Sequence, residues 1–441
     1  MIAIIGAGIS GLTLAYELQQ RHVPYRLFDR GGEPGGLMRS RREADYLIEL
    51  GPNSLLGDAA LLAWIDQLEL TPEITFANPV SKARFIYRNG AYQPLPTGPL
   101  SLIFSSFFSW ETKKAIWRER TNRTVSSPGE TLSEFFRRRF SQELVEYALA
   151  PFVAGIYAGD PDRLLVSETF PVLLSYEKEY GSVLKGFIKN AGANRRQSFS
   201  FRNGLQTLPK ALASRLTHLN LNDSVDRLTK TETGWVLETQ SGSYAADAVV
   251  LACDTNAAAG LLKPHSPDLA ALLRQIDYPP MTAVHSVYKR ADVKHPLNGF
   301  GGLNPRQENR FVSGHIWSSS VFEGRCPADE VLLTSLVGGS QREENARQPD
   351  EVIQQRLHQE LSQAFGIRAE KPHRQWITRW ERAIPQYDAR ILPVKARIPA
   401  LQSSRLYVCA NWYQGTSLSD CIRKARELAA QLAGAGREGD F

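Results

Sequence analysis

The feature that most constrains this chain is a glycine pattern close to its start. The apolar run IAII leads into Gly6-x-Gly8-x-x-Gly11, and LTLAYELQQ continues from there with helical periodicity. A second expected strand, YRLFD, ends at Asp29. In such a unit the first glycine permits a tight turn, the second admits a pyrophosphate and the third allows close helix–strand packing. The sequence therefore predicts a βαβ unit that binds a dinucleotide at a helix N-terminus.

Asp29 and two later glycine turns indicate which dinucleotide the protein binds. Asp29 follows Gly11 by 18 positions, which suits a carboxylate that accepts a hydrogen bond from a ribose hydroxyl. The first motif alone leaves FAD and NAD open. GGEPGGLMRS then brings a second close backbone approach after the second strand, and ELGPNS adds a third glycine-containing turn. A longer, two-part ligand needs these additional turns more than NAD does, so the pattern favours FAD.

Strands of the nucleotide-binding type occur in three separated blocks, namely at the start, near Val249 and near Val408. We therefore expect an α/β fold with α+β insertions, in which a discontinuous Rossmann-like FAD-binding domain carries a strand-rich substrate domain and a helical insertion. The expected ranges are FAD-binding 1–80, 201–270 and 396–441, a substrate-domain ribbon 81–98, a helical insertion 99–200 of membrane or partner type, and a substrate-binding domain 271–395.

Composition limits the setting of the protein. The 441 residues carry a net charge of +6, a mild excess that favours anionic partners, and we expect no nucleic-acid partner. The four cysteines form no CxxC pair and have no histidine at metal spacing, so we expect buried thiols and no metal site. No apolar run reaches the ~18 residues of a membrane span. Because an expected strand already begins at Ile2, we expect no signal peptide, and we expect the protein to be cytoplasmic.

The segment SKARFIYRNGAYQPLPTG, residues 81–98, predicts a hairpin that carries positive charge. Asn89-Gly90 is a strong hairpin turn signal. Lys82, Arg84 and Arg88 lie on the expected ribbon between apolar residues. From the ribbon alone, solvated charges that protect an edge strand are the commoner explanation. The alternative is that one arginine binds the carboxylate of a ligand, because the planar guanidinium pairs bidentately with an acid.

Several blocks spread along the chain resemble the protoporphyrinogen oxidase family, within the flavoenzyme superfamily of amine oxidases. They are ARFIYRNGAYQPLPTG, LAPFVAGIYAGDPDRL, NGFGGLNP, LVGGS, AIPQY and NWYQGTSLSDCI. The chain is also similar to the bacterial branch that oxidises coproporphyrinogen III. The resemblance implies an FAD-dependent oxidoreductase of haem and porphyrin biosynthesis, acting on CH–CH bonds with oxygen as acceptor.

The resemblance also implies which residues bind the cofactor and the substrate. The FAD-binding positions that it carries over are Gly6, Ala7, Gly8, Ile9, Ser10, Gly11, Asp29, Arg30, Leu37, Gly51, Pro52, Asn53, Ser54, Val225, Thr416, Ser417 and Leu418. The substrate positions are Arg84, as a propionate clamp, and Gly155, Phe300, Leu303 and Leu336, which line the macrocycle. With this support Arg84 is expected to be functional, whereas Lys82 and Arg88 stay edge charges. Thr416 and the stretch DARILPV after AIPQY depart from the family pattern.

The implied reaction is the oxidation of protoporphyrinogen IX to protoporphyrin IX. Six electrons leave in three hydride transfers to the flavin, and oxygen or another acceptor reoxidises the flavin, with oxygen giving hydrogen peroxide. No side chain in the matching blocks is an obvious general base, so no catalytic residue is expected beyond the flavin. We read His285 and His315 as buried residues and expect no single histidine to be essential.

Alternatives stay open at this point. Coproporphyrinogen III is the first alternative substrate, and other flavin amine oxidases, desaturases or a non-catalytic FAD-binding scaffold are more remote. The segment SLIFSSFFSWETKKAIWRER mixes aromatic and basic residues. It leaves open peripheral contact with the cytoplasmic face of a membrane, a homodimer face or a channel wall. A downstream haem-pathway enzyme is a further candidate partner.

Overall fold

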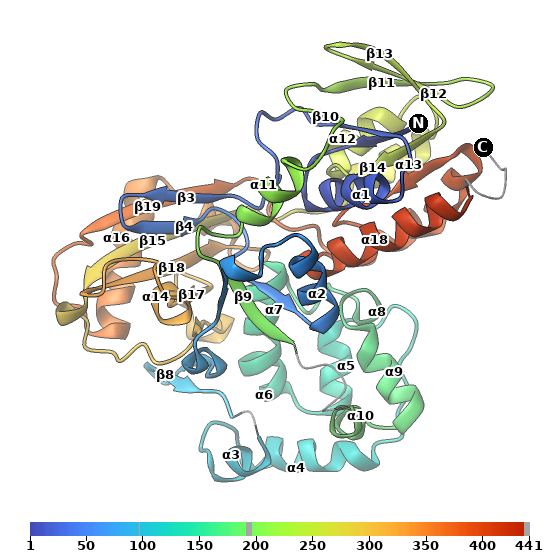
Figure 1. The fold of residues 1–441 in the computed structure, drawn as a ribbon. Coiled ribbons are helices and arrows are strands. Elements are labelled where there is room, and N and C mark those ends of the chain that lie inside the picture. Colours follow the sequence, from blue (N-terminus) through green and yellow to red (C-terminus); the bar gives the residue numbers. More distant parts are fainter. Residues whose placement is uncertain (97, 191–195, 436–441) are drawn as a thin grey trace.

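A five-stranded parallel sheet joins strands from the start, the middle and the end of the chain (Figure 1). The computed structural model describes residues 1–96, 98–190 and 196–435. Across this sheet the order is β10 (Leu219–Asn220), β2 (Tyr25–Phe28), β1 (Ile2–Ile5), β14 (Ala248–Leu251) and β20 (Leu406–Val408). All neighbouring pairs are parallel. The apolar runs form buried strands because helices and a second sheet cover both faces.

Alternation along β1 directs its side chains into two different layers. Ile2 and Ile4 face α1 (Ile9–Gln20) and α18 (Leu418–Ala435), which pack on each other. Ala3 and Ile5 face the opposite layer. That layer consists of β11 (Val225–Lys230), β12 (Trp235–Thr239), β13 (Gly242–Ala246), α12 (Thr255–Leu262), α13 (Pro267–Arg274) and α17 (Ile391–Leu401). The expected α/β fold class is confirmed, and such sheets bind ligands beyond the carboxyl ends of their strands.

A seven-stranded, mostly antiparallel sheet forms the second large layer. Its order is β19 (Arg374–Trp380), β15 (Met281–Lys289), β18 (Glu330–Gly338), β17 (Gly314–Ile316), β16 (Gly301–Leu303), β7 (Phe85–Arg88) and β8 (Ala91–Pro94). The predicted hairpin joins β7 to β8, with positive φ at both Asn89 and Gly90. α16 (Asp350–Phe365) packs on this sheet through residues spaced at the helical period, while α14 (Ser318–Val321) and α15 (Glu343–Ala346) are short.

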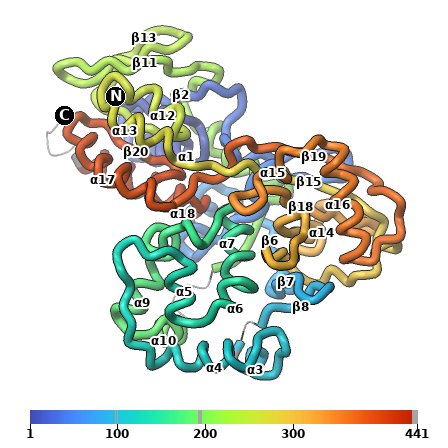
Figure 2. The backbone as a smooth tube through the Cα atoms, turned by 180° about the vertical axis from the view of Figure 1, so that it is seen from behind, coloured from blue at the N-terminus to red at the C-terminus, as the bar shows by residue number. Residues whose placement is uncertain are grey.

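Helices fill most of the chain between β8 and β9 (Gln197–Phe201). They are α3 (Pro99–Phe104), α4 (Trp110–Arg118), α5 (Leu132–Arg139), α6 (Gln142–Leu144), α7 (Ala150–Tyr157), α8 (Val166–Thr169), α9 (Pro171–Tyr180) and α10 (Val183–Lys189). A π-helical turn at Val145–Leu149 joins α6 to α7. Seen from behind, this block lies below the parallel sheet and beside the seven-stranded sheet (Figure 2). Among the described residues, every helix is too short or too polar to cross a membrane.

Smaller elements connect these parts. A hairpin is formed by β3 (Ser40–Glu43) and β4 (Tyr46–Glu49), and a second small sheet has the order β5 (Leu55–Gly57), β9 and β6 (Ile74–Phe76), with α2 (Ala59–Gln67) and α11 (Thr207–Ala213) nearby. Short 3₁₀ turns lie at Thr71–Glu73, Pro79–Lys82, Glu119–Thr121, Arg290–Asp292, Arg306–Glu308 and Gln402–Ser404. The expected domain boundaries after residues 200, 270 and 395 fall inside β9, α13 and α17. β9 also pairs with β5 and β6 of the N-terminal part, so the domain ranges remain a proposal.

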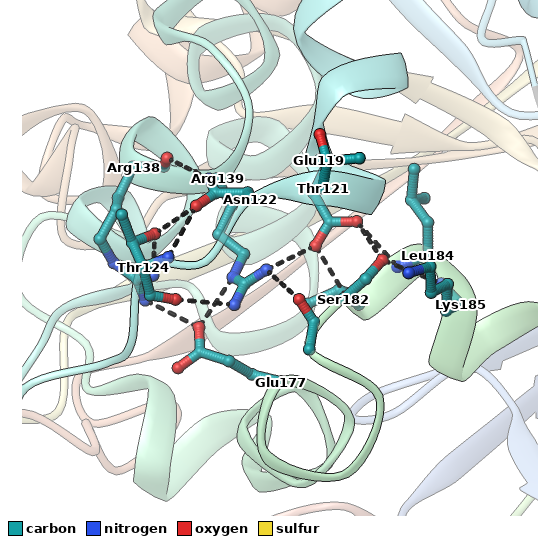
Figure 3. A network of polar contacts seen from close by, with 12 residues as sticks. Glu119, Thr121, Asn122, Thr124, Arg138, Arg139, Glu177, Ser182, Leu184 and Lys185 are labelled. Atoms are coloured by element: carbon teal, nitrogen blue, oxygen red, sulfur yellow. Dashed lines mark hydrogen bonds and ion pairs between the residues drawn. The ribbon is translucent and has the colours of Figure 1, made fainter.

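A buried ionic network holds the helical block together (Figure 3). The guanidinium of Arg139 donates to Glu119 at 2.8 Å and to Glu177 at 2.7 Å. Glu119 also accepts from the hydroxyl of Ser182 at 2.6 Å, and Arg138 donates to Glu177 at 3.0 Å. Because the paired charges satisfy one another, the network fixes α5, α9 and α10 relative to the turn at 119–121.

Candidate functional site: a flavin cradle beside an apolar surface

The loop between β1 and α1 is shaped by its glycines. Gly6 has φ +112°, and a Cβ on Gly11 would lie 1.9 Å from the carbonyl oxygen of Gly6. A Cβ on Gly8, in contrast, would meet no protein atom within 4 Å. No side chain caps α1 at Gly8, so the helix N-terminus can accept an anion in place of a cap. Gly6 and Gly11 are therefore required by the protein's own packing, whereas Gly8 borders open space.

Asp29, at the end of β2, binds the backbone of this loop through its carboxylate. One carboxylate oxygen accepts from the backbone N–H of Ala7 at 2.6 Å, and the other accepts from that of Gly31 at 2.7 Å. Each oxygen keeps a second lone pair, so the carboxylate can still accept from a ribose hydroxyl. Arg30 is exposed and reaches Asp254 at 3.6 Å.

Val225, the expected adenine contact, begins β11 in the segment that follows β10. That segment is hydrogen-bonded to the end of β2, because the N–H of Asp223 donates to the Asp29 carbonyl oxygen at 2.9 Å. The pairing of β11 with β12 shifts by one register step between Val225 and Arg227. Val225 therefore lies close in the fold to Asp29.

The second and third glycine turns follow the first in contact with one another. The N–H of Gly35 donates to the carbonyl of Ala7 at 2.8 Å, and Gly35 forms an isolated parallel bridge with Gly8. A Cβ on Gly51 would lie 1.8 Å from the carbonyl oxygen of Leu37, whose side chain is half exposed. The third turn continues through Pro52, Asn53 and Ser54 to β5. Three turns that are separated in sequence thus form one continuous backbone surface.

The C-terminal block completes this surface. Thr416 and Ser417 directly precede α18, which starts at Leu418. The Ser417 hydroxyl accepts from the N–H of Asp420 at 3.1 Å, and Ser419 donates to the carbonyl of Leu56 at 2.6 Å. The start of α18 is therefore tied to β5, immediately after the third turn, while its body packs on α1.

Arg84 lies at the edge of the seven-stranded sheet, just before β7. Its guanidinium carbon is 3.9 Å from the centre of the Phe300 ring, and it donates to the carbonyl of Ser81. Within the described ranges it forms no ion pair with a carboxylate. Burial lowers the pKa of Arg84, but a guanidinium stays charged at neutral pH. Arg84 therefore offers a positive charge that the protein itself does not neutralise.

The other expected substrate residues surround the contact of α7 with the sheet. A Cβ on Gly155 would lie 3.0 Å from Cδ2 of Leu303, so any larger residue at 155 would press on β16. Leu303 pairs in register with Ile86 of β7, which places it near the ribbon that Arg84 begins. Leu336 packs in a cluster with Ala158, the residue after α7. The structure thus brings Gly155, Leu303 and Leu336 to one apolar surface along α7.

Arg88 differs from the solvated edge charge that the sequence suggested. It is half-buried, donates to Glu143 at 2.8 Å and to the Phe107 carbonyl, and lies 4.1 Å from the Tyr147 ring centre. Burial opposes ionisation of Glu143, but hydrogen bonds from Thr112, Ser109 and Arg88 outweigh it and lower the pKa of Glu143 to about 2. Arg88 is therefore a structural link between the ribbon and the helical block. Lys82 is exposed, as the sequence suggested.

His285 and His315 are buried in the seven-stranded sheet. Nδ1 of His285 lies 3.0 Å from the Thr334 hydroxyl, and Nδ1 of His315 lies 2.8 Å from that of Ser335. Burial lowers the pKa of each to about 3, which leaves both rings neutral near pH 7. Among the described residues there is no cluster of His, Cys, Asp and Glu that could hold a metal ion.

Comparisons with known proteins place the chain in a family. The model for flavin-containing amine oxidoreductases matches residues 9–433. The chain belongs to this family. Protoporphyrinogen oxidase 2 of Arabidopsis thaliana is 32% identical, covering 97% of this chain and 92% of its own length. Protoporphyrinogen oxidase of Bos taurus is 29% identical, covering 98% of both chains. The resemblance noted in the sequence is confirmed, and the protein is an FAD-dependent oxidoreductase of this family.

Solved structures support the fold alone. A protein from an Exiguobacterium species, provisionally described as a protoporphyrinogen oxidase, superimposes with TM-score 0.81 at 24% identity over 98% of both chains. Reduced UDP-galactopyranose mutase superimposes with TM-score 0.74 at 16% identity over 98% of this chain and 95% of its own. The same fold therefore occurs in proteins of different activity, and only local geometry can indicate a substrate.

Sequence reasoning missed two buried charges at the cradle. Glu49, just before the third turn, accepts from Arg325 at 2.8 Å and from the N–H of Leu205 at 3.1 Å. Lys424 lies inside α18, three residues after buried Cys421 and next to buried Ala425. A lysine on the apolar stripe of the closing helix was the available signal for the second.

Proposed function

We propose that this protein is an FAD-dependent porphyrinogen oxidase whose preferred substrate is protoporphyrinogen IX. The unneutralised guanidinium of Arg84, stacked on Phe300 at the edge of an apolar surface, carries the proposal. A porphyrinogen combines a wide apolar ring with carboxylates at its rim, which matches one cation beside apolar side chains. The near full-length similarity to curated protoporphyrinogen oxidases supports the same substrate class.

In this proposal FAD follows the chain of turns. Its diphosphate would be held at Gly8 and the start of α1, its ribose at Asp29 and its adenine near Val225, with Arg30 alongside. Leu37, the turn at 51–54 and the start of α18 at 416–418 would hold the flavin end. The open space at Gly8 and the uncapped α1 support this fit.

Bound flavin would accept two electrons in each of three cycles, and three molecules of oxygen would take up the six electrons and six hydrogens as hydrogen peroxide. The protein's own residues supply binding and orientation. Arg84 fixes the rim of the macrocycle, and Gly155, Leu303 and Leu336 let the ring lie flat against α7 while excluding water. His285 and His315 are too weakly basic at neutral pH to take up a proton.

Coproporphyrinogen III is the second candidate substrate. It carries four propionates in place of two and would need additional cations at the rim. Arg88 is already paired with Glu143 and Lys82 stays an edge charge, so among the described residues of the ribbon Arg84 alone is left for a substrate carboxylate. This pairing favours the substrate with fewer carboxylates.

A steady-state assay tests the choice. The FAD-loaded protein is incubated in air with each porphyrinogen, while porphyrin fluorescence and hydrogen peroxide are recorded together. The expected result is about three peroxides per porphyrin and a higher kcat/KM for protoporphyrinogen IX. A higher kcat/KM for coproporphyrinogen III would reverse the preference, and oxidation of an amine alone would place the protein with the amine oxidases.

We further propose that the α3–α4 end of the helical block rests on an anionic membrane surface. Its exposed side chains include Phe104, Trp110 and Trp117, which are 83%, 68% and 70% exposed. Lys113 lies over the Trp110 ring, and Arg120 lies over that of Trp117. Figure 1 shows α3 and α4 at the end of the molecule farthest from the parallel sheet. Aromatic residues flanked by cations are typical of interfacial attachment.

Vesicle co-sedimentation tests this attachment. The protein should bind vesicles that contain phosphatidylglycerol more strongly than neutral ones, and added salt should weaken the binding. The double variant Phe104→Ser, Trp117→Ser should lose most of it, whereas Val80→Ser, at an exposed apolar site elsewhere, should not. Equal binding by the double variant and the parent would contradict the assignment.

A further inference from the structure

Lys424 is a buried cation inside α18. The residue is 7% exposed, and its Nζ donates to the carbonyl oxygens of Ala410 at 2.8 Å and Gly415 at 2.9 Å, and to that of Tyr413. Among the described residues no carboxylate lies within ion-pair distance of Nζ, and its three hydrogen-bond acceptors are all neutral carbonyls.

The carbonyls that Lys424 binds belong to the turn between β20 and α18. This turn ends at Gly415, which has φ +108° and whose N–H donates to the Tyr387 hydroxyl at 3.0 Å. Thr416–Leu418, the expected flavin contact, follow at once. The lysine therefore reaches back from the second turn of α18 and fixes the backbone that leads to the flavin end of the cradle.

Lys424 holds this turn in its charged form, because the three carbonyls take up the three N–H donors of an ammonium group. Burial of an ammonium ion is nevertheless unfavourable, and it lowers the pKa of Lys424. Neutral carbonyls satisfy its N–H donors. The acid that acts on its charge is Asp420, one helical turn earlier, whose partly exposed carboxylate accepts from Ser417 and Arg423 and not from Lys424. A diphosphate at the start of α1 already has a helix N-terminus and the backbone of the glycine loop. A buried anion for Lys424 is therefore one that forms near the start of α18.

We propose that Lys424 is a positioning residue that favours the reduced flavin over the oxidised flavin. The inference rests on the placement of FAD in the proposed function. In each cycle two electrons and one proton pass to the flavin as a hydride, and the substrate's N–H proton goes to solvent. The ring therefore gains one negative charge, which the buried ammonium of Lys424 and the N-terminus of α18 stabilise together. Oxygen then takes up the hydride and one proton as hydrogen peroxide, and the charge disappears.

The test measures the midpoint potential of the bound flavin in Lys424→Met, Lys424→Gln and Lys424→Arg. Arg423→Met is the matched control, because it removes a cation one position away that pairs with Asp420 and Glu427 at the surface. Both neutral Lys424 variants should lose about tenfold in relative affinity for reduced flavin, which is about 30 mV more negative for a two-electron couple. Lys424→Arg should recover part of the shift, and Arg423→Met should leave the potential unchanged.

Melting curves of the apoprotein and of the FAD-loaded protein separate a structural role from an electrostatic one. If both neutral variants melt earlier but keep the parent's potential, Lys424 only clamps the turn and the proposal is overturned. If Lys424→Met does not fold, Lys424→Gln still reports, because its amide offers two N–H donors to these carbonyls without charge. A parent protein that takes up no FAD would instead contradict the proposed function.

Discussion

At the scale of single residues, the glycine loop separates packing from ligand binding. A Cβ at Gly11 collides with the protein's own backbone, whereas a Cβ at Gly8 meets only open space. The fingerprint assigns these two roles to Gly8 and Gly11 from the sequence, and the atoms that face each Cα agree with the assignment.

Gly8→Ala should therefore impair FAD uptake without harming the apoprotein. We expect the melting temperature of the apoprotein to stay within about 2 °C of the parent, since the backbone at Gly8 has an ordinary φ of −71°. The Kd for FAD should rise at least tenfold, because the methyl group occupies the space assigned to the diphosphate. Fluorescence titration with FAD measures this. Gly11→Ala is the contrast and should fail to fold; equal FAD binding by Gly8→Ala would place the diphosphate elsewhere.

Arg84→Ala should raise the KM for protoporphyrinogen IX roughly tenfold to a hundredfold, as expected for a lost charged hydrogen bond of about 1.5–3 kcal/mol. kcat should change much less, since the flavin is untouched. Lys82→Ala, two residues earlier and exposed, is the control and should behave like the parent. Steady-state kinetics with both porphyrinogens provide the measurement. An unchanged KM in Arg84→Ala would exclude the proposed role of Arg84 in binding a propionate.

His315→Asn should keep turnover and reduce the acid sensitivity of the fold. Burial lowers the pKa of His315 to about 3, whereas in the unfolded chain it is near 6.5. Between these values the unfolded chain binds an additional proton, so stability is fully present above pH 6.5 and is lost as the pH falls toward 3. Urea midpoints at pH 7.5 and 5 should differ less in the variant than in the parent. Loss of turnover by a folded, FAD-loaded variant would show that the ring has a chemical role.

At the scale of elements, sequence patterns predicted the elements with strong local signals. Asn89-Gly90 gave the β7–β8 turn, and the apolar runs gave β1 and β14. Strand pairs and ion pairs between segments far apart in the chain were not predictable in the same way. β9 lay within an expected helical block, yet it pairs with β5 and β6, because pairing depends on tertiary contacts that periodicity does not encode. The pairing of Arg88 with Glu143, 55 positions later, was missed for the same reason.

The network around Arg139 should stabilise the helical block. Arg139→Met leaves Glu119 and Glu177 buried with less compensation, so we expect a loss of about 3–5 kcal/mol in the free energy of unfolding. Denaturant unfolding measures this. FAD binding should remain close to the parent's in the folded fraction, because the network lies outside the cradle. Arg137→Met, which removes a more exposed ion pair with Asp162, should cost less than about 1 kcal/mol.

At the scale of the whole molecule, the cradle is assembled from both ends of the chain. The glycine turns of residues 6–54 meet the start of α18 only because β1, β14 and β20 lie side by side in one sheet. The fingerprint and the three blocks of strands were enough to predict this fold class. The domain boundaries stay a proposal, because elements such as α13 and α17 pack in one shared layer.

Anaerobic mixing of the FAD-loaded protein with a limiting amount of protoporphyrinogen IX tests the central claim most directly. The account predicts that the yellow absorbance of the flavin bleaches, that three flavins are reduced for each porphyrin formed, and that admitting air restores the colour. A flavin that stays oxidised with protoporphyrinogen IX and with coproporphyrinogen III, in a protein that is fully loaded and folded, would contradict it.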